Sequence, residues 1–259
     1  MADLAWGQSN MNATEMPSVL LDYKLTAKVK GNWTGLAQLE WQLENVATSE
    51  ATPYQLQLNM QVGPKLMQLI QRKTRSAGVL GAQGLVPQRY DEDVKVITQS
   101  PKKSTVLMEP DFVTLANAKR LKTPLGVQDA TSQFMQLTWA LSQQVGRQAR
   151  PVSAGQKLAF PVALPRGIDI WRYEVLGSEK VETPFGPVDA WHLRPTLEKG
   201  SDYSAEAWLA PSMHYLPVRI QIRQDADTFI DMTLANLPKL LPKPLPSSPV
   251  ARKAASSTN

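Results

Sequence analysis

The stretch that decides the fold is residues 21–44, LDYKLTAKVKGNWTGLAQLEWQLE. Apolar residues occupy every second position from Leu21 to Val29, and again from Ala37 to Leu43, with a turn at Gly31-Asn32 between the two runs. Successive side chains of a strand point to opposite faces of a sheet. The pattern therefore predicts a hairpin whose two strands each have one face in the core and one face in solvent.

The same alternation recurs along the chain in about a dozen short segments. The clearest of them cover residues 54–62, 216–222 and 230–234. Strands with one apolar face need an interior, and a long antiparallel sheet provides one when it curls. We therefore expect one mainly β domain over residues 18–236, built as a large curved antiparallel sheet that forms an open or partly closed barrel.

One segment changes to helical spacing. Phe134, Leu137, Leu141 and Val145 recur at intervals of three and four residues, which is the spacing of one helix face. Asp129, Thr131 or Ser132 can cap the start of this helix and Gly146 can end it. We predict a helix near 130–145 that packs against the sheet or plugs one end of the barrel.

The two ends of the chain lack this patterning. Residues 1–17 are polar and are expected to form a flexible lead-in. Residues 237–259 combine five prolines with four basic residues and no acidic one, which predicts a disordered Pro-rich basic tail. The tail is either a solvated end or a docking strip for an envelope protein, peptidoglycan or anionic lipid headgroups.

Charge and composition exclude several classes of protein. The net charge is +5, but without the four basic residues of the tail the body carries 24 basic against 23 acidic groups. A groove for nucleic acid would need its basic excess in the folded part, so no nucleic acid partner is expected. The chain has no cysteine, which excludes disulfides and thiolate sites. No apolar run reaches 18 residues, so no transmembrane segment is expected in this chain.

The two histidines, His192 and His214, are the natural candidates for catalysis or metal binding. Neither has a second histidine at metal-ligand spacing, and the chain has no His-Glu-x-x-His or Gly-x-Ser-x-Gly motif. We therefore assign no catalytic, cofactor-binding or metal-binding residue and expect no cofactor. A hydrolase of envelope glycan or lipid is the least favoured alternative, since a triad depends on geometry and not on a motif.

A second group of residues could face a ligand or simply pack in the core. Aromatic side chains offer large apolar surfaces for either role. The candidates are Tyr23, Trp41, Trp171, Trp191, Trp208, His192 and His214. A set of glutamines on the polar strand faces could line a sugar-binding groove or could simply be exposed to solvent: Gln38, Gln42, Gln55, Gln57 and Gln61.

Five phrases in this order resemble the bacterial exported domain-of-unknown-function family numbered 3108. They are residues 84–89 (GLVPQR), 128–134 (QDATSQF), 182–190 (ETPFGPVDA), 207–211 (AWLAP) and 215–220 (YLPVRI). The resemblance covers roughly residues 18–236. It implies a β-rich protein of the periplasm or cell envelope, with no established activity and no family catalytic residues. Residues 1–6 show no export signal, so either the protein stays inside the cell or the sequence begins after a removed signal or anchor. The resemblance favours the second.

The favoured function is therefore non-enzymatic. The apolar inner faces, with a single helix to cover them, suggest a protein that binds a lipid or other amphipathic small molecule in the concave face of its sheet. The alternative is a structural or assembly factor of the envelope that docks partners by a sheet edge or by the Pro-rich tail.

Overall fold

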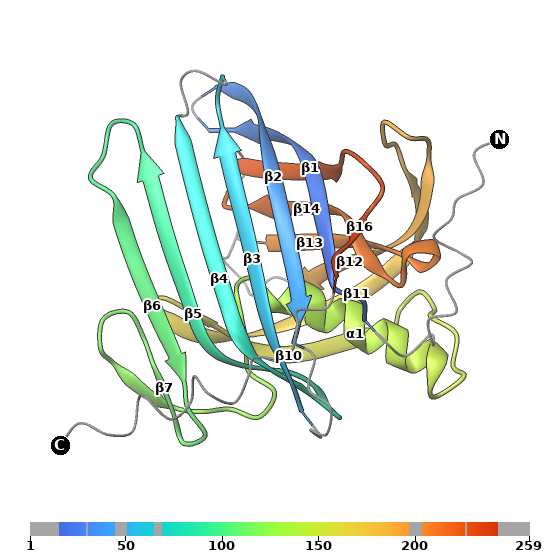
Figure 1. The fold of residues 1–259 in the computed structure, drawn as a ribbon, viewed down its shortest axis with the longest axis horizontal. Helices are drawn as coiled ribbons and strands as arrows, with labels where there is room; N and C mark the ends of the chain where they lie inside the picture. Colours follow the sequence, from blue (N-terminus) through green and yellow to red (C-terminus); the bar gives the residue numbers. More distant parts are fainter. Residues whose placement is uncertain are drawn as a thin grey trace.

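All the strands of the protein's computed structural model pair into one sheet (Figure 1). The structure describes residues 16–29, 31–44, 51–64, 69–196, 204–225 and 227–242. The strand order is β8-β7-β6-β5-β4-β3-β2-β1-β15-β14-β13-β12-β11-β10-β9, and β16 also pairs with β1. Every pairing is antiparallel except that of β9 with β10.

The first eight strands follow one another as antiparallel neighbours: β1 (Val19–Lys28), β2 (Asn32–Leu43), β3 (Thr52–Val62), β4 (Ile70–Gly81), β5 (Gly84–Val96), β6 (Lys102–Met108), β7 (Phe112–Thr114) and β8 (Arg120–Lys122). Strand β9 (Gln128–Asp129) comes next in the chain and pairs with β10 instead of β8. The helix α1 (Ser132–Gly146) follows β9, and the prediction of one helix in this region is confirmed. The second half contains β10 (Lys157–Leu164), β11 (Gly167–Val181), β12 (Val188–Thr196), β13 (Ser204–Ala210), the short 3-10 helix η2 (Pro211–Met213), β14 (Leu216–Arg223), β15 (Phe229–Leu234) and β16 (Lys239–Leu240).

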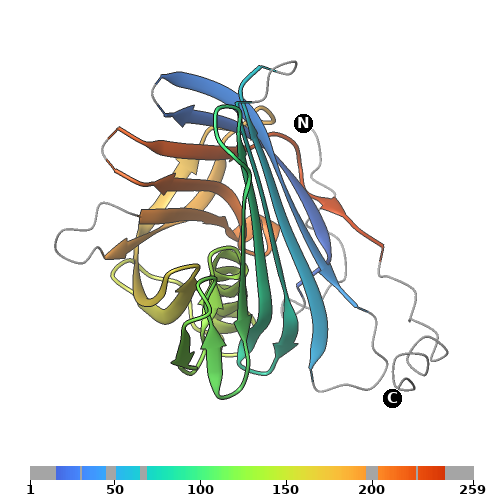
Figure 2. The ribbon, with the colours of Figure 1, turned by 90° about the vertical axis from the view of Figure 1, so that its left-hand side faces the viewer.

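Strand β1 joins the two halves. One of its edges pairs with β2, and residues 23–28 pair on the other edge with β15. The sheet folds over along this line, so that the wall formed by β2–β6 faces the wall formed by β11–β14 (Figure 2). Strands β8 and β9 lie at opposite ends of the strand order and do not pair. The sheet is therefore an open barrel, as the sequence predicted.

Side chains close part of the gap that hydrogen bonds leave open. A second apolar cluster gathers Tyr90, Val106 and Val113 from β5–β7 with Val127 and Ala163, which lie at β9 and β10. Next to it, the backbone amide of residue 116 donates to the carbonyl of residue 165 at 3.2 Å. The two ends of the sheet thus meet here by packing, without a strand ladder.

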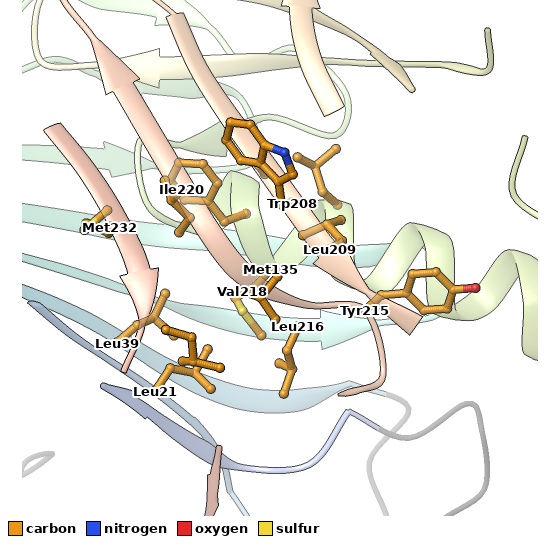
Figure 3. Close-up of a cluster of buried hydrophobic side chains, with 14 of the residues drawn as sticks. Leu21, Leu39, Met135, Trp208, Leu209, Tyr215, Leu216, Val218, Ile220 and Met232 are labelled. Carbon is orange, nitrogen blue, oxygen red and sulfur yellow. The ribbon is translucent and has the colours of Figure 1, made fainter. Parts of the chain in front are cut away.

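The inner face holds the main core. Tyr23, Leu39, Trp41, Leu56 and Ile220, all predicted to face inward, are at most 1% exposed. Figure 3 shows side chains from β1, β2, β13, β14, β15 and α1 in one cluster. Within a close-packed interior of this kind, every apolar side chain of α1 that points at the sheet stabilises both elements.

Asp129 fixes the start of α1. One carboxylate oxygen, Oδ1, accepts the backbone N–H groups of Thr131 and Ser132, each at 2.8 Å. The other oxygen accepts the Ser76 hydroxyl at 2.5 Å, and that hydroxyl also lies 3.0 Å from the hydroxyl of Tyr54. The carboxyl is fully buried, and this burial raises the pKa of Asp129. The N-cap position itself is Thr131, whose side chain makes no capping bond. The Asp129 carboxylate ties the start of the helix to Ser76 of β4 and, through that hydroxyl, to Tyr54 of β3.

Two glycines allow adjacent strands to approach closely. A Cβ atom on Gly35 would lie 2.0 Å from the carbonyl oxygen of Gln61, and one on Gly78 would lie 2.2 Å from the carbonyl oxygen of Val86. Gly78 also lies at the register shift between β4 and β5. Glycine at such points permits the local bend that a curled sheet requires.

Ordered structure extends past residue 237, where the sequence suggested that the disordered tail begins. The short strand β16 pairs with Val19 and Leu20 of β1, and the ammonium group of Lys239 lies 2.8 Å from Asp22. Residues 243–259, which hold the rest of the predicted tail, and most of the lead-in lie outside the described residues.

The Asp129 network gives a test of how the helix is held. We expect Asp129→Ala to lower the free energy of unfolding by about 3 kcal/mol, because it leaves buried donors without partners. Asp129→Asn keeps the acceptor for both backbone N–H groups and should cost about 1 kcal/mol. Urea denaturation measures both, with the exposed Asp169→Ala as the control. Equal costs for the alanine and asparagine variants would contradict this account.

Candidate functional site

The inner face of the sheet is only half-buried at one end of β4 and β5. One row of paired residues runs from Tyr23 through Ala37 and Met60 to Arg72 and Val94. The first three are at most 5% exposed, whereas Arg72 and Val94 are half-buried. All five lie on the same face because directly paired residues of an antiparallel sheet share a face. The interior is therefore uncovered where this row crosses β4 and β5.

This uncovered region lies at the end of the interior away from α1, which is the upper end in Figure 1. The other end of β5 meets the helix, since the amide of Leu85 donates to the Gln136 side chain at 2.8 Å. We call the uncovered region the upper inner surface. It comprises the half-buried residues Trp33, Ile70, Arg72, Glu92, Val94, Val96, Ile222 and Ile230.

The upper inner surface combines branched apolar side chains with one ion pair. The guanidinium group of Arg72 lies 2.6 Å from the carboxylate of Glu92, and their side chains are 24% and 15% exposed. The hydroxyl of Ser104 donates to the second carboxylate oxygen at 3.3 Å. A pair held this way is neutral as a whole and offers both a donor and an acceptor to a third group.

Three of the aromatic residues singled out in the sequence lie in the core. The Tyr23 hydroxyl donates to the carbonyl of Pro217 at 2.8 Å. The Trp41 ring stacks on Tyr54 with 5.1 Å between centroids, and Trp171 is 7% exposed. These contacts are those of packing residues. Trp191 is half-buried and packs against the edge of the same core.

His192 and Trp208 meet on the outer face of the sheet, where both side chains are buried and Trp208 also packs against the main core. They are paired across β12 and β13, and their rings stack with centroids 4.1 Å apart. The guanidinium carbon of Arg219, from β14, lies 4.4 Å from the centroid of the Trp208 ring in a cation–π contact. The stack lies on the opposite face from the core residues Leu193 and Ala207, which alternate with it along the same strands.

Both nitrogens of the His192 ring face carboxylates. Nε2 lies 2.7 Å from Glu206, and Nδ1 lies 3.7 Å from Glu179, which also accepts the indole N–H of Trp208. A triad histidine needs one nitrogen directed at its nucleophile. Here both nitrogens are directed at acids, so the arrangement favours a structural ion-pair network over the hydrolase alternative.

Glu206 is the anionic centre of this network. Burial alone would raise the pKa of Glu206, but the hydrogen bonds from His192 and Arg194 outweigh burial and hold the pKa below its ordinary value. The side chain is 11% exposed. On this outer face the carboxylate therefore stabilises the folded protein while it is ionised.

His214 occupies the turn after η2. Its backbone is left-handed, with φ 53°, and its carbonyl accepts the Ser142 hydroxyl of α1 at 3.0 Å. Burial lowers the pKa of His214. Within the described residues, no group of three or more histidine or acidic side chains is placed to hold a metal ion. The helices of this part of the chain are also too short or too polar to cross a membrane.

The fold defines an open β-barrel protein, and the comparisons agree with it. A family model described as "Protein of unknown function (DUF3108)" matches residues 22–235. The chain belongs to that family, as the five phrases indicated. No curated protein matches it.

A solved structure from Brucella abortus, described as a beta-barrel-like protein of domain of unknown function DUF1849, is similar in fold. The TM-score is 0.52 at 11% sequence identity, and the match covers 88% of this chain and 100% of the other. At this identity the similarity concerns the architecture alone.

Sequence reasoning missed Arg72 and Glu92. A signal was present, because the inward positions of β4 change from apolar Ile70 to Arg72, Thr74 and Ser76. Part of that change belongs to the network at α1, where the Thr74 hydroxyl accepts the hydroxyl of Thr131 at 2.8 Å. The alternation alone does not show whether an inward polar residue is hydrogen-bonded in the core, as Thr74 is, or lies on an uncovered surface, as Arg72 does.

The outer network predicts a pH dependence. The pKa of Glu206 is lowered by folding, so its contribution to stability is present above its ordinary value of 4.5 and is lost as the pH falls through the lowered pKa. Glu206→Gln should cost about 1 kcal/mol at neutral pH, and this difference from the wild type should shrink in acid. Urea denaturation at neutral pH and in acid checks this, with the exposed Glu182→Gln as the control. A difference that is independent of pH would contradict it.

Proposed function

We propose that this protein is a non-enzymatic component of the bacterial envelope that binds an amphipathic small molecule at its upper inner surface. The observation that carries the proposal is the change in exposure along the inner face. The row that starts at Tyr23 is almost fully buried from β1 to β3, and it becomes half-buried and mixed in character at Arg72 on β4 and Val94 on β5.

The apolar part of a ligand would gain by covering this surface. Ile70, Val94, Val96, Ile222 and Ile230 remain in contact with water although they face the interior. Removing apolar surface from water contributes roughly 25 cal/mol per Å². A flexible hydrocarbon chain is the kind of ligand that can follow such an irregular set of branched side chains.

The polar part of the ligand would lie at the ion pair. Arg72 and Glu92 neutralise each other at 2.6 Å, so a headgroup with a single net charge would compete with one partner of the pair. A zwitterionic or neutral headgroup can instead donate to the carboxylate and accept from the guanidinium group. The pair therefore favours a zwitterionic or neutral amphiphile over an anionic one.

The gap in the barrel provides access. Strand β6 pairs with β7 only through Leu107 and Met108, and within the described residues the rest of this edge of β6 has no partner strand. A ligand could therefore reach the upper inner surface past this edge without any opening of the β1–β15 ladder. Lysines 102 and 103 on the edge are charges that oppose pairing with another sheet.

A location in the envelope is supported by the absence of cysteine and by the resemblance on which the exported character rests. Fractionation of cells that produce the full-length protein tests the location. Recovery with periplasmic or membrane markers is expected, and recovery with cytosolic markers would contradict it.

Ligand binding is tested with lysophosphatidylcholine carrying a brominated acyl chain, because bromine quenches tryptophan at contact distance. We expect quenching of Trp33, which lies on the upper inner surface, and loss of that quenched component in Trp33→Phe. Val94→Ser should weaken binding, whereas Val86→Ser at the far end of β5, 53% exposed, should not. Native mass spectrometry counts the lipid bound.

Two results would contradict the proposal. One is a lack of binding by wild-type protein that is folded by circular dichroism. The other is equal binding by the two serine variants, which would place the lipid elsewhere.

A further inference from the structure

The outer face of β2–β5 carries a hollow that the proposed function does not use. It has a volume of about 330 Å³, which falls within the range of ~300–1,000 Å³ typical of small-molecule sites. Its origin is visible in the register, since Gln42, Gln55, Ala77 and Arg89 form one row across the four strands. Ala77 is the short side chain in a row of long ones, so it forms the floor.

The charged groups around the hollow comprise one ion pair, Arg89 with Asp91, and two groups that are hydrogen-bonded to glutamine amides. Arg89 makes two hydrogen bonds to Asp91, at 2.6 and 2.8 Å. The Nε atom of Arg75 donates to Gln57 at 2.8 Å, and the Glu40 carboxylate accepts the amide of Gln42 at 2.5 Å. Two basic and two acidic residues line the hollow, so its net charge is zero.

Uncharged hydrogen-bonding groups remain unoccupied in the hollow. In the described structure the Gln55 amide makes no hydrogen bond, and Gln57 and Gln42 each use one end of the amide and leave the other free. Each planar amide offers both a donor and an acceptor. These are three of the five glutamines that stood out on the polar strand faces in the sequence.

These features make the free energy of binding unfavourable for two kinds of ligand. An apolar molecule would cover the amides without replacing their hydrogen bonds to water. An ion of either sign would meet basic and acidic groups in equal number, so the hollow as a whole does not attract it. A neutral molecule dense in hydroxyl groups meets neither cost, because each hydroxyl can both donate and accept.

We propose that this hollow binds a neutral oligosaccharide. The amides of Gln42, Gln55 and Gln57 would bond adjacent sugar hydroxyls, and the open space over Ala77 would accept the ring. The site lies on the opposite face of the sheet from the upper inner surface, so it is independent of the amphiphile site.

The test uses three neutral probes, cellotetraose, maltotetraose and chitotetraose, each titrated into the ¹⁵N-labelled full chain and followed by NMR. We expect at least one of them to bind and to shift the amides of residues 55–57 and 75–77. Ala77→Gln should fill the hollow and weaken binding at least tenfold, about 1.4 kcal/mol. Ala159→Gln makes the same change at an exposed strand position outside the hollow and should bind like the wild type.

Gln55→Ala is the second variant, and it keeps the test decisive if Ala77→Gln does not fold. It removes a free amide from an exposed side chain and should also weaken binding. Three outcomes overturn the proposal: no binding of any probe at millimolar concentration, binding that neither variant weakens, or shifts in this region produced only by a polyanion such as heparin. Lysophosphatidylcholine binding should be unchanged in Ala77→Gln, so the two proposals can fail separately.

Discussion

The ladder between β1 and β15 is the contact on which the rest of the structure depends. It joins strands from opposite ends of the chain, with Tyr23 opposite Leu234 and Lys28 opposite Phe229. Without it the hairpins on each side would be two separate ribbons, each with one apolar face exposed to water. With it they become two walls of one interior, and the inner residues of both walls bury against each other.

A single helix cannot cover such an interior from end to end. Asp129 and Ser76 hold the start of α1 beneath β4, and Phe134, Met135 and Leu141 bury against the sheet at that end. The lower end is thereby closed by the helix and by the second apolar cluster. The upper end has no element over it in the described structure, and the inner positions there become the half-exposed residues of the proposed amphiphile site.

The alternation of apolar residues predicted most of this architecture. The hairpin at residues 21–44, the helix and the open barrel are confirmed, because each depends on a local period that sequence displays directly. Strand β4 shows the limit of this signal. It continues to Gly81, although the register shift at Ala77 and Gly78 interrupts the alternation without ending the pairing.

The sites were harder to predict because they depend on register and on coverage. His192 was read as an isolated histidine, and only the pairing of β12 with β13 brings Trp208 against it and Glu206 beside it. The glutamines were recognised, but the hollow among them exists because Ala77 falls in the row of Gln55. Neither relation is encoded in the spacing along one strand.

The most direct measurement of the central claim is native-state hydrogen exchange of the full chain. If β1 and β15 hold the two walls together, amides of residues 23–28 and 229–234 should exchange in one slowest group, through global unfolding. Amides at the upper ends of β4 and β5 should exchange faster, through local opening. Exchange of β15 well before β1, with the first wall still protected, would show that the walls are independent and would contradict the account.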